Sequence, residues 1–299
     1  MSIEHSQNPN DKTSVEIVEI SEELMSYHRT KKQIKEHYDV EKQLAFELRQ
    51  ATKEERRSLY SSLYDELYRK VPHHPQLTRK KSLSETLEVT AAQMQFLHPF
   101  LAEDLTFLEI GPGDCSLSYE VAKVAKQVFA VDVSDEITKS IQTPSNFQLI
   151  LSDGSSIPIT PGSVNVAYSN QLMEHLHPED AFEQLQNIFD TLAIGGVYIC
   201  ITPNRLTGPH DISKHFDSVA TGFHLKEYTN AELRSLFRKA GFSNVAVYLN
   251  VRGLYIRFPV FIFAIIERIP SFFSARFRFR ITRNKLYRGL LNCCFVGTK

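Results

Sequence analysis

The segment that decides the fold is residues 107–116, which read FLEIGPGDCS. An apolar run reaches the acid Glu109, crosses a turn bracketed by Gly111 and Gly113, and opens into a segment with helical character. A second apolar run follows and ends on Asp132. Glycine lets the backbone approach a ligand closely and adopt positive φ angles. The pattern therefore predicts a β-turn-α-β unit that binds a nucleoside.

Two classes of nucleoside ligand use this layout. Asp132, at the tip of the second strand, is placed to accept the two hydroxyls of a ribose in either class. The dinucleotide fingerprint has a third glycine three residues after the second, where this sequence has Ser116. A pyrophosphate needs that glycine-rich helix start, whereas an adenosine with an amino-acid tail does not. The sequence thus favours an adenosyl ligand over a nicotinamide dinucleotide, and both remain alternatives at this point.

At these residues the chain resembles the class I S-adenosylmethionine-dependent methyltransferases, a family with a Rossmann-like fold. Residues 108–113 are close to the first motif of the family, and Asp132 matches the acid that its members use on the ribose. Three further segments resemble later motifs in the right order, namely residues 151–154 (LSDG), 161–168 (PGSVNVAY) and 192–197 (LAIGGV). The resemblance covers residues 105–249, with residues 294–298 as the expected last strand.

The resemblance implies S-adenosyl-L-methionine as the cofactor and assigns roles to individual residues. Glu109 is expected to position the glycine turn and the amino-acid end of the cofactor. Asp153 is expected beside the adenine amino group, and Asn170 below the sulfonium. The residues expected to bind the cofactor are Glu109, Gly111, Gly113, Asp132, Asp153, Gly154 and Asn170.

Strand-like and helix-like segments alternate with short connections, which predicts a doubly wound, mostly parallel α/β sheet. The family resemblance implies seven strands. We expect them at residues 105–110, 127–132, 146–151, 164–169, 196–202, 244–249 and 294–298. The expected core helices are residues 116–125, 179–192 and 230–240, and a further amphipathic helix at 84–97 leads into the first strand.

The chain is expected to divide into four parts. These are a mobile tail (1–30), an N-terminal helical extension (31–100), a methyltransferase core (101–250 with 291–299) and a basic-aromatic helical insert (251–290). In the extension, Tyr60, Tyr64 and Tyr68 recur at steps of four and form a stripe along one helix. A packing face is the first interpretation of this stripe, and a face that lines the substrate site is the alternative.

Composition limits the class of protein. The 299 residues have 42% hydrophobic content, which suffices for a real core, and a formal net charge of −1, which would not collect nucleic acid. The four cysteines form no C-x-x-C pair, so neither a disulfide framework nor a zinc knuckle is expected. The N-terminal residues lack an apolar signal region. A cytoplasmic protein is therefore expected, with peripheral contact to the inner membrane face as a further option.

The candidate catalytic residues are histidines that follow strands. A hydroxyl acceptor needs a general base more than an amine does. His175 follows the fourth expected strand, and His210 and His224 follow the fifth. Packing or helix capping is the alternative role for each. The three histidines and two aspartates after the fifth strand also suggest a metal site, but their spacings fit no metal-ligand pattern, so no metal is expected.

The insert 251–290 is rich in arginine and phenylalanine, with Glu267 as its single acid. It could form a cap over the sheet edge, contact an anionic membrane or lipid-linked substrate, or grip nucleic acid. No nucleic-acid module accompanies it, so nucleic acid is not expected as a partner.

The leading hypothesis is a methyltransferase that O-methylates a small molecule, sugar or lipid-linked glycan. The alternatives are an NAD-type oxidoreductase and a non-catalytic nucleotide-binding scaffold.

Overall fold

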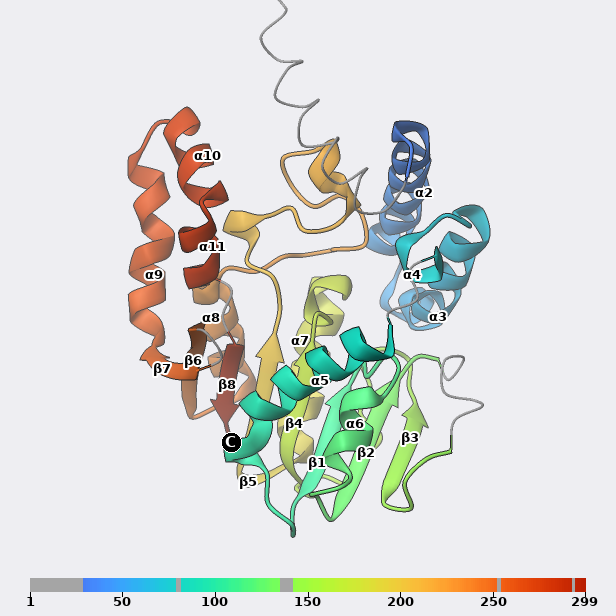
Figure 1. Cartoon of the computed structure of the whole chain (residues 1–299), viewed down its shortest axis with the longest axis vertical. Helices are drawn as coiled ribbons and strands as arrows, with labels where there is room; N and C mark the ends of the chain where they lie inside the picture. The colour runs from blue at the N-terminus through green and yellow to red at the C-terminus, as the bar shows by residue number, and fades with distance from the viewer. Residues whose placement is uncertain (1–28, 79–81, 135–141, 252–253, 292–293) are drawn as a thin grey trace, which may run out of the picture.

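One eight-stranded sheet with helices on both faces forms the centre of the computed structural model (Figure 1). The structure describes residues 29–78, 82–134, 142–251, 254–291 and 294–299. The expected mobile tail lies outside the described residues, apart from its last two positions. The strand order is β3-β2-β1-β4-β5-β8-β6-β7. The predicted doubly wound, mostly parallel fold is confirmed, and the sheet has one strand more than expected.

Five parallel strands form the half of the sheet that positions the site. They are β1 (Thr106–Ile110), β2 (Gln127–Asp132), β3 (Phe147–Leu151), β4 (Val164–Asn170) and β5 (Leu192–Ile201). Strand β1 pairs in parallel with both β2 and β4. The carboxyl ends of these three strands therefore meet at one edge of the sheet, which is where ligands of such sheets bind.

The remaining strands extend the sheet in antiparallel fashion. Strand β8 (Cys294–Thr298), which was expected as the last strand, lies between β5 and β6 (Asn244–Val251). Strand β7 (Leu254–Pro259) pairs with β6 at the sheet edge. This segment was predicted as the start of a helical insert, and that part of the prediction is wrong. Its alternation of apolar and polar residues is a strand pattern, and Pro259 ends it.

Side chains of successive strand residues point to opposite faces, so the sheet contributes side chains to two hydrophobic cores, one on each face. Phe107 packs in the core under helices α5 (Leu83–Leu97) and α6 (Ser116–Val121). Its neighbour Leu108 packs in the core under helices α7 (Pro178–Thr191) and α8 (Asn230–Ala240). The same alternation in β4 places Tyr168 in the first core and Ala167 in the second. Both faces of the parallel strands are covered, as parallel sheets require.

Helices α2 (Lys31–Gln50), α3 (Lys53–Lys70) and α4 (Pro75–Thr78) precede the sheet in sequence and lie beyond the carboxyl ends of its strands (Figure 1). A Thr and a Gln or Glu three residues later form a capping box at the start of α2 and α3. The buried guanidinium of Arg56 binds the carboxylate of Asp180 through two hydrogen bonds, of 2.6 and 2.8 Å. This pair joins α3 to α7.

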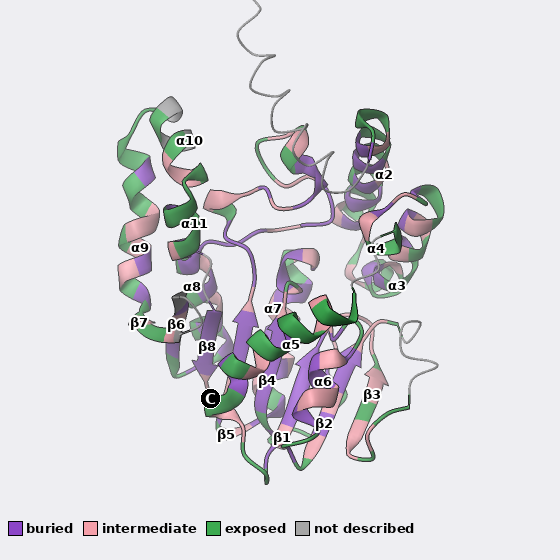
Figure 2. Ribbon diagram, viewed as in Figure 1, coloured by how far each residue is buried: buried purple, intermediate pink, exposed green. Residues whose placement is uncertain are grey.

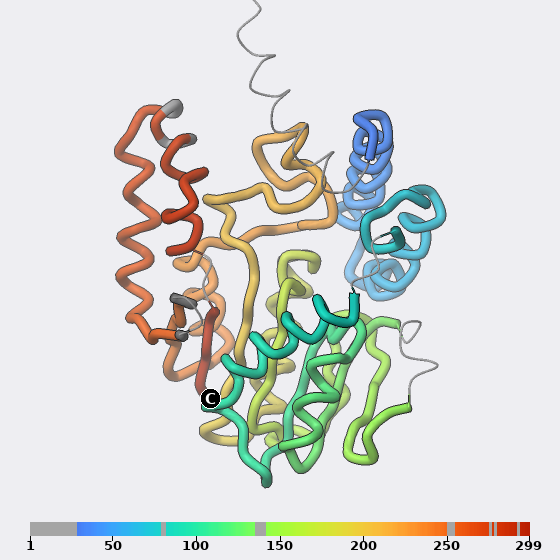
Figure 3. Tube along the Cα trace, in the orientation of Figure 1, coloured from blue at the N-terminus to red at the C-terminus, as the bar shows by residue number. Residues whose placement is uncertain are grey.

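The connection from β5 to α8 also lies beyond the carboxyl ends of the strands, beside α2 in the chain trace (Figure 3). Arg49 of α2 donates hydrogen bonds to the carbonyl oxygens of Thr221, Gly222 and His224. Helix α2 thereby holds a segment more than 170 residues away in sequence. The short 3-10 helices are η2 (His98–Phe100), η3 (Met173–His175), η4 (Arg205–Thr207), η5 (Ile212–His215) and η6 (Ile269–Phe272).

Helices α9 (Val260–Arg268), α10 (Ala275–Arg283) and α11 (Lys285–Leu291) lie near the edge of the sheet formed by β6 and β7, away from α2–α4 (Figure 1). Their ribbons are exposed over much of their length (Figure 2). Among the described residues, none of the helices is both long enough and apolar enough to cross a membrane.

Candidate active site

A cavity of about 410 Å³ lies at the carboxyl ends of β1 and β2. Small-molecule sites usually have volumes of about 300–1,000 Å³. The wall combines the turn after β1, the end of β2 and helix α3. Backbone or polar groups are brought to this wall by Gly111, Gly113, Asp132, Ser134, Gly154 and Gln171.

The turn after β1 is built from left-handed backbone conformations. Gly111 has a φ of 66° and Gly113 a φ of 58°. The backbone N–H of Gly111 donates a 2.9 Å hydrogen bond to the carbonyl of Val131, which ties the turn to β2. A Cβ on Gly111 would lie 3.0 Å from Leu172, whereas a Cβ on Gly113 would meet nothing within 4 Å. Gly113 therefore borders open space in the cavity wall, where a ligand can come close to the backbone.

Glu109 lies behind this turn and is buried. The hydroxyl of Ser118 in α6 donates a 2.6 Å hydrogen bond to its carboxyl group. Burial raises the pKa of Glu109 to about 8, against the opposing effect of that hydrogen bond. The side chain joins β1 to α6 and is not part of the cavity wall.

Asp132 lines the cavity at the tip of β2. Its carboxylate accepts hydrogen bonds from the backbone N–H groups of Val133 (2.6 Å) and Ser134 (3.3 Å). Burial raises the pKa of Asp132 above its ordinary value, although these backbone donors act in the other direction. One carboxylate oxygen is thus held by the chain, and the group stays available to hydroxyl donors in the cavity.

Asp153 follows β3 and is turned into its own loop. Its carboxylate accepts hydrogen bonds from the backbone of Ser155 (3.0 Å) and Ser156 (2.8 Å) and lies 3.3 Å from the guanidinium of Arg57. Burial alone would raise the pKa of Asp153, but these donors and Arg57 lower it. Of this pair of predicted residues, Gly154 lines the cavity and Asp153 does not.

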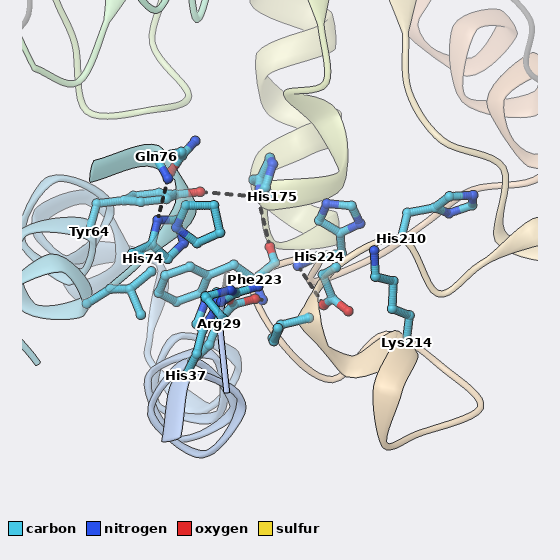
Figure 4. Close-up of a pocket in the computed structure, with 15 residues that line it drawn as sticks. Arg29, His37, Tyr64, His74, Gln76, His175, His210, Lys214, Phe223 and His224 are labelled. Atoms are coloured by element: carbon cyan, nitrogen blue, oxygen red, sulfur yellow. Dashed lines mark hydrogen bonds and ion pairs between the residues drawn. The ribbon is translucent and has the colours of Figure 1, made fainter. Parts of the chain in front are cut away.

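A second cavity of about 330 Å³ adjoins the first. Four residues line both cavities and form the boundary between them, namely Tyr64, Gln76, His175 and Phe223. Five histidines contribute to the second cavity, namely His37, His74, His175, His210 and His224 (Figure 4). They come from three separate regions of the chain, and the three histidines predicted from the sequence are among them.

His175 is fixed by two groups at one ring nitrogen. Nδ1 lies 3.1 Å from the carbonyl oxygen of Phe223 and 3.1 Å from the hydroxyl of Tyr64 (Figure 4). Because a carbonyl only accepts hydrogen bonds, Nδ1 carries the proton and Nε2 keeps its lone pair. Burial lowers the pKa of His175 to about 4, so the ring is neutral at pH 7.

His210 and His224 share one carboxylate. Nδ1 of His224 lies 2.7 Å from Oε1 of Glu227, and Nδ1 of His210 lies 3.2 Å from Oε2. Burial would raise the pKa of Glu227, but hydrogen bonds from the two histidines lower it to about 2. The rings of His175 and His224 meet edge to face, with centroids 4.8 Å apart.

The chain matches a known protein family. Residues 76–247, more than half of the chain, match the family described as methyltransferase domain. The chain belongs to this methyltransferase family.

Two curated relatives are described as probable S-adenosylmethionine-dependent methyltransferases. A probable S-adenosylmethionine-dependent methyltransferase of Mycolicibacterium smegmatis is 32% identical over 137 residues, which are 45% of this chain and 51% of that protein. A protein of Mycobacterium tuberculosis with the same description is 30% identical over 141 residues, 47% of this chain and 49% of that protein. The chain thus spans about half the length of the curated relatives it matches.

A solved structure shares the fold. Phosphoethanolamine N-methyltransferase 1 of Haemonchus contortus, in complex with phosphoethanolamine and S-adenosylhomocysteine, has a TM-score of 0.51 and 15% identity. The similarity covers 83% of this chain and 50% of that one. The predicted family and cofactor are confirmed: the chain carries an S-adenosylmethionine-dependent methyltransferase domain.

The first cavity of the methyltransferase domain suits this cofactor. Open space borders Gly113, and the carboxylate of Asp132 offers acceptor atoms for ribose hydroxyls. Apolar side chains of Ile110, Val131 and Leu172 provide surface for an adenine ring. Asn170, the last residue of β4, does not line the cavity, whereas its neighbour Gln171 does.

Sequence reasoning missed several residues that line the two cavities. Glu41 and His37 lie four residues apart on the buried face of α2, and Glu41 accepts a 2.9 Å hydrogen bond from the backbone N–H of Phe223. The sequence signal that could have identified them is the pair of titratable residues, His37 and Glu41, on an otherwise apolar face of the helix. The tyrosine stripe was expected first as a packing face, and the structure places Tyr60, Tyr64 and Tyr68 in the wall of the first cavity.

Proposed function

We propose that the protein transfers a methyl group from S-adenosylmethionine to a hydroxyl of a small-molecule, sugar or lipid-linked glycan acceptor. The observation that carries the proposal is the boundary between the two cavities. A nucleoside-type cavity and a histidine-lined cavity meet at Tyr64, Gln76, His175 and Phe223. Two reactants that bind on either side of this boundary would be held for direct transfer.

The cofactor supplies an electrophilic methyl group on a sulfonium. In our proposal Gly111 and Gly113 admit it, Asp132 accepts the ribose hydroxyls, and Gly154 and Gln171 border its adenosine. Glu109 and Asp153 support the backbone around the cavity from outside its wall, and Asn170 ends β4 next to Gln171. Good alignment of two reactants can supply about 7–11 kcal/mol of the barrier. The main task of these residues is therefore orientation.

On the acceptor side, we propose roles for His175, His224 and His210. His175 is closest to the cofactor cavity because it lines both cavities, and its Nε2 lone pair is unprotonated at neutral pH. His224 and His210, paired with Glu227, complete the wall that holds the acceptor. In the reaction the oxygen–methyl bond forms, the sulfur–methyl bond breaks, and the hydroxyl proton is released. A polar, hydrogen-bonding wall of this kind favours a hydroxylated acceptor.

The test uses the purified full chain, cofactor with a labelled methyl group, and extract of the source cell. The expected result is a labelled small molecule or glycan whose label is in a methyl ether, identified by mass spectrometry. A label on an amine nitrogen or on a carbon atom would show that the acceptor atom is not a hydroxyl oxygen. A protein that binds S-adenosylhomocysteine but labels nothing would support the scaffold alternative. Binding of NAD in place of S-adenosylhomocysteine would support the oxidoreductase.

We further propose that helices α9–α11 contact an anionic membrane surface, which would suit a lipid-linked acceptor. Phe272 is 82% exposed and Leu286 is 75% exposed. The same three helices carry five exposed cations, namely Arg268, Arg280, Arg283, Lys285 and Arg288. The single acid, Glu267, is turned inward and accepts hydrogen bonds from Asn204 and from the backbone at the start of α8. The exposed surface is thus basic and aromatic, a combination that favours anionic lipid interfaces.

Co-sedimentation with vesicles tests this contact. Vesicles with anionic lipid are expected to bind the full chain, and binding is expected to fall with added salt. A double variant, Phe272→Ser with Lys285→Glu, should lose most of this binding. The matched control is Leu83→Ser with Lys126→Glu, because Leu83 is equally exposed and Lys126 lies before β2 at the other end of the strands. Equal binding by both double variants would exclude the proposed surface.

A further inference from the structure

Three potential ligand atoms converge behind the wall of the second cavity. Glu174, His175 and His224 each bring one such atom within 4.8 Å of the other two. Glu174 and His175 belong to η3, after β4, and His224 belongs to the connection after β5. His224 follows His175 by 49 positions in the sequence (224 − 175), so no local motif identifies this group.

Each of the three side chains is held from outside by another group. The hydroxyl of Thr202 donates a 2.9 Å hydrogen bond to Oε2 of Glu174. Nδ1 of His175 donates to the carbonyl of Phe223, and Nδ1 of His224 lies 2.7 Å from the carboxylate of Glu227. These contacts leave Oε1 of Glu174 and both Nε2 atoms for a further partner. Metal-binding histidines have this arrangement, in which the second ring nitrogen is bound by a carbonyl or carboxylate.

Glu174 provides an independent observation. Its side chain is fully buried, with 0% exposure. Its Oε1 atom has no hydrogen-bond partner among the described residues. A buried carboxylate oxygen without a hydrogen-bond partner is costly. A cation at this point would supply the missing interaction.

We propose that Glu174, His175 and His224 bind a divalent transition-metal ion such as zinc. Two imidazoles and one carboxylate suit such ions, and three protein ligands leave a coordination position open. His175 and His224 line the second cavity, so the open position faces the proposed acceptor. The inference rests on the proposed function and deepens it: the ion would bind the acceptor hydroxyl and promote loss of its proton to solvent. No metal was expected from the sequence, because the ligands come from two connections with no recognisable spacing.

A second group of two histidines and one glutamate differs from the proposed metal site. The ligand atoms of His37, Glu41 and His74 also lie close together. There, however, Nδ1 of His37 contacts Arg29 at 3.0 Å, and Nε2 contacts Glu41 at 2.8 Å. Both nitrogens of His37 are already used, and Glu41 also accepts a hydrogen bond from the chain. This group is a hydrogen-bond network that holds α2 against the site.

The experiment measures metal binding directly. The full chain is treated with chelator, dialysed, and titrated with zinc chloride by calorimetry. We expect one equivalent to bind, and cobalt in its place to give visible absorption bands of a nitrogen- and oxygen-bound ion. Glu174→Gln should weaken binding at least tenfold and change these bands. His74→Gln is the matched control and should bind as the unchanged protein does.

Two outcomes would overturn the inference: no zinc binding by the chelator-treated protein, or equal affinity in Glu174→Gln and the unchanged protein. Circular dichroism shows whether Glu174→Gln is folded, and Thr202→Val, which removes only an outer contact, provides a milder variant with an expected smaller loss. Binding of S-adenosylhomocysteine and methyl transfer are measured on the same samples. Methyl transfer that persists fully without metal would also overturn this inference, and it would leave the proposed function intact. Zinc binding without methyl transfer would support the metal site and remove the proposed function.

Discussion

The hydroxyl of Tyr64 lies 3.1 Å from Nδ1 of His175, and this contact joins helix α3 to the loop after β4. The N-terminal helices therefore take part in forming the proposed acceptor site. Glu41 of α2 makes a second such link, because it holds the backbone of Phe223, whose carbonyl fixes the same ring nitrogen.

Tyr64→Phe should slow methyl transfer without weakening cofactor binding. The substitution removes one neutral hydrogen bond to His175, worth about 0.5–1.5 kcal/mol, so kcat is expected to fall about 2- to 10-fold. Steady-state kinetics and calorimetry with S-adenosylhomocysteine check the two quantities separately. Tyr68→Phe is the control, because that hydroxyl contacts Gln76 and not His175. An equal loss in both variants would mean that Tyr64 does not act through His175.

Asp132→Ala should weaken cofactor binding with the fold intact. The ribose hydroxyls would lose their acceptor in a buried site, which costs about 1–3 kcal/mol, or about 5- to 150-fold in affinity. Calorimetry with S-adenosylhomocysteine measures the change. Asp104→Ala, at an exposed position before β1, is the control. Unchanged affinity in a folded Asp132→Ala protein would remove the ribose assignment.

Gly113→Ala should lose cofactor affinity, whereas Gly162→Ala should not. Both glycines have positive φ angles, of 58° and 71°, and neither Cβ would meet an atom within 4 Å. Each substitution therefore costs about 1–2 kcal/mol of stability through backbone strain alone. Only Gly113 borders the cavity, where the new methyl group would occupy ligand space. Parallel measurements of unfolding and of S-adenosylhomocysteine binding separate the two effects, and similar affinities in the two variants would argue against a ligand at Gly113.

Asp180→Ala should strongly destabilise the protein. It leaves the guanidinium of Arg56, which is 3% exposed, without its bidentate partner. Loss of one member of a buried ion pair costs about 3–5 kcal/mol. Glu36→Ala removes an exposed pair with Lys32 and should cost at most about 0.5 kcal/mol. Urea unfolding compares the two, and a small effect of Asp180→Ala would show that α3 is not firmly bound to α7.

Glu109 should make stability fall as pH rises. Its folded pKa of about 8 lies above the value of 4.5 for a free side chain. Below pH 4.5 both states are protonated, and between pH 4.5 and 8 only the unfolded state gives up the proton. The free energy of unfolding therefore decreases through this window, by at most about 1.4 kcal/mol per pH unit from this group. Glu109→Gln should flatten the dependence in unfolding experiments without ligand. An unchanged slope would contradict a protonated Glu109.

The positions of strands β1 to β6 along the chain and the glycine turn could be predicted from the sequence, because each depends on local patterns. Runs of apolar residues, the glycine pair and an acid at a strand tip define one β-turn-α-β unit within 30 residues. Strand β7 was missed because its short alternating pattern lies within a basic-aromatic segment that favoured a helical interpretation.

By itself, the sequence determined the doubly wound fold, the adenosyl-type cofactor and three of the five histidines in the second cavity. Only the tertiary structure decided what surrounds those histidines. Glu41, Tyr64, His175 and His224 come from segments separated by up to 183 positions in the chain, and no local pattern encodes such a meeting. The direction of the Asp153 carboxylate was likewise decided in three dimensions, by the donors of its own loop and by Arg57. Local preferences fix the turns and strands, whereas a site made of distant side chains exists only once the helices have packed against the sheet.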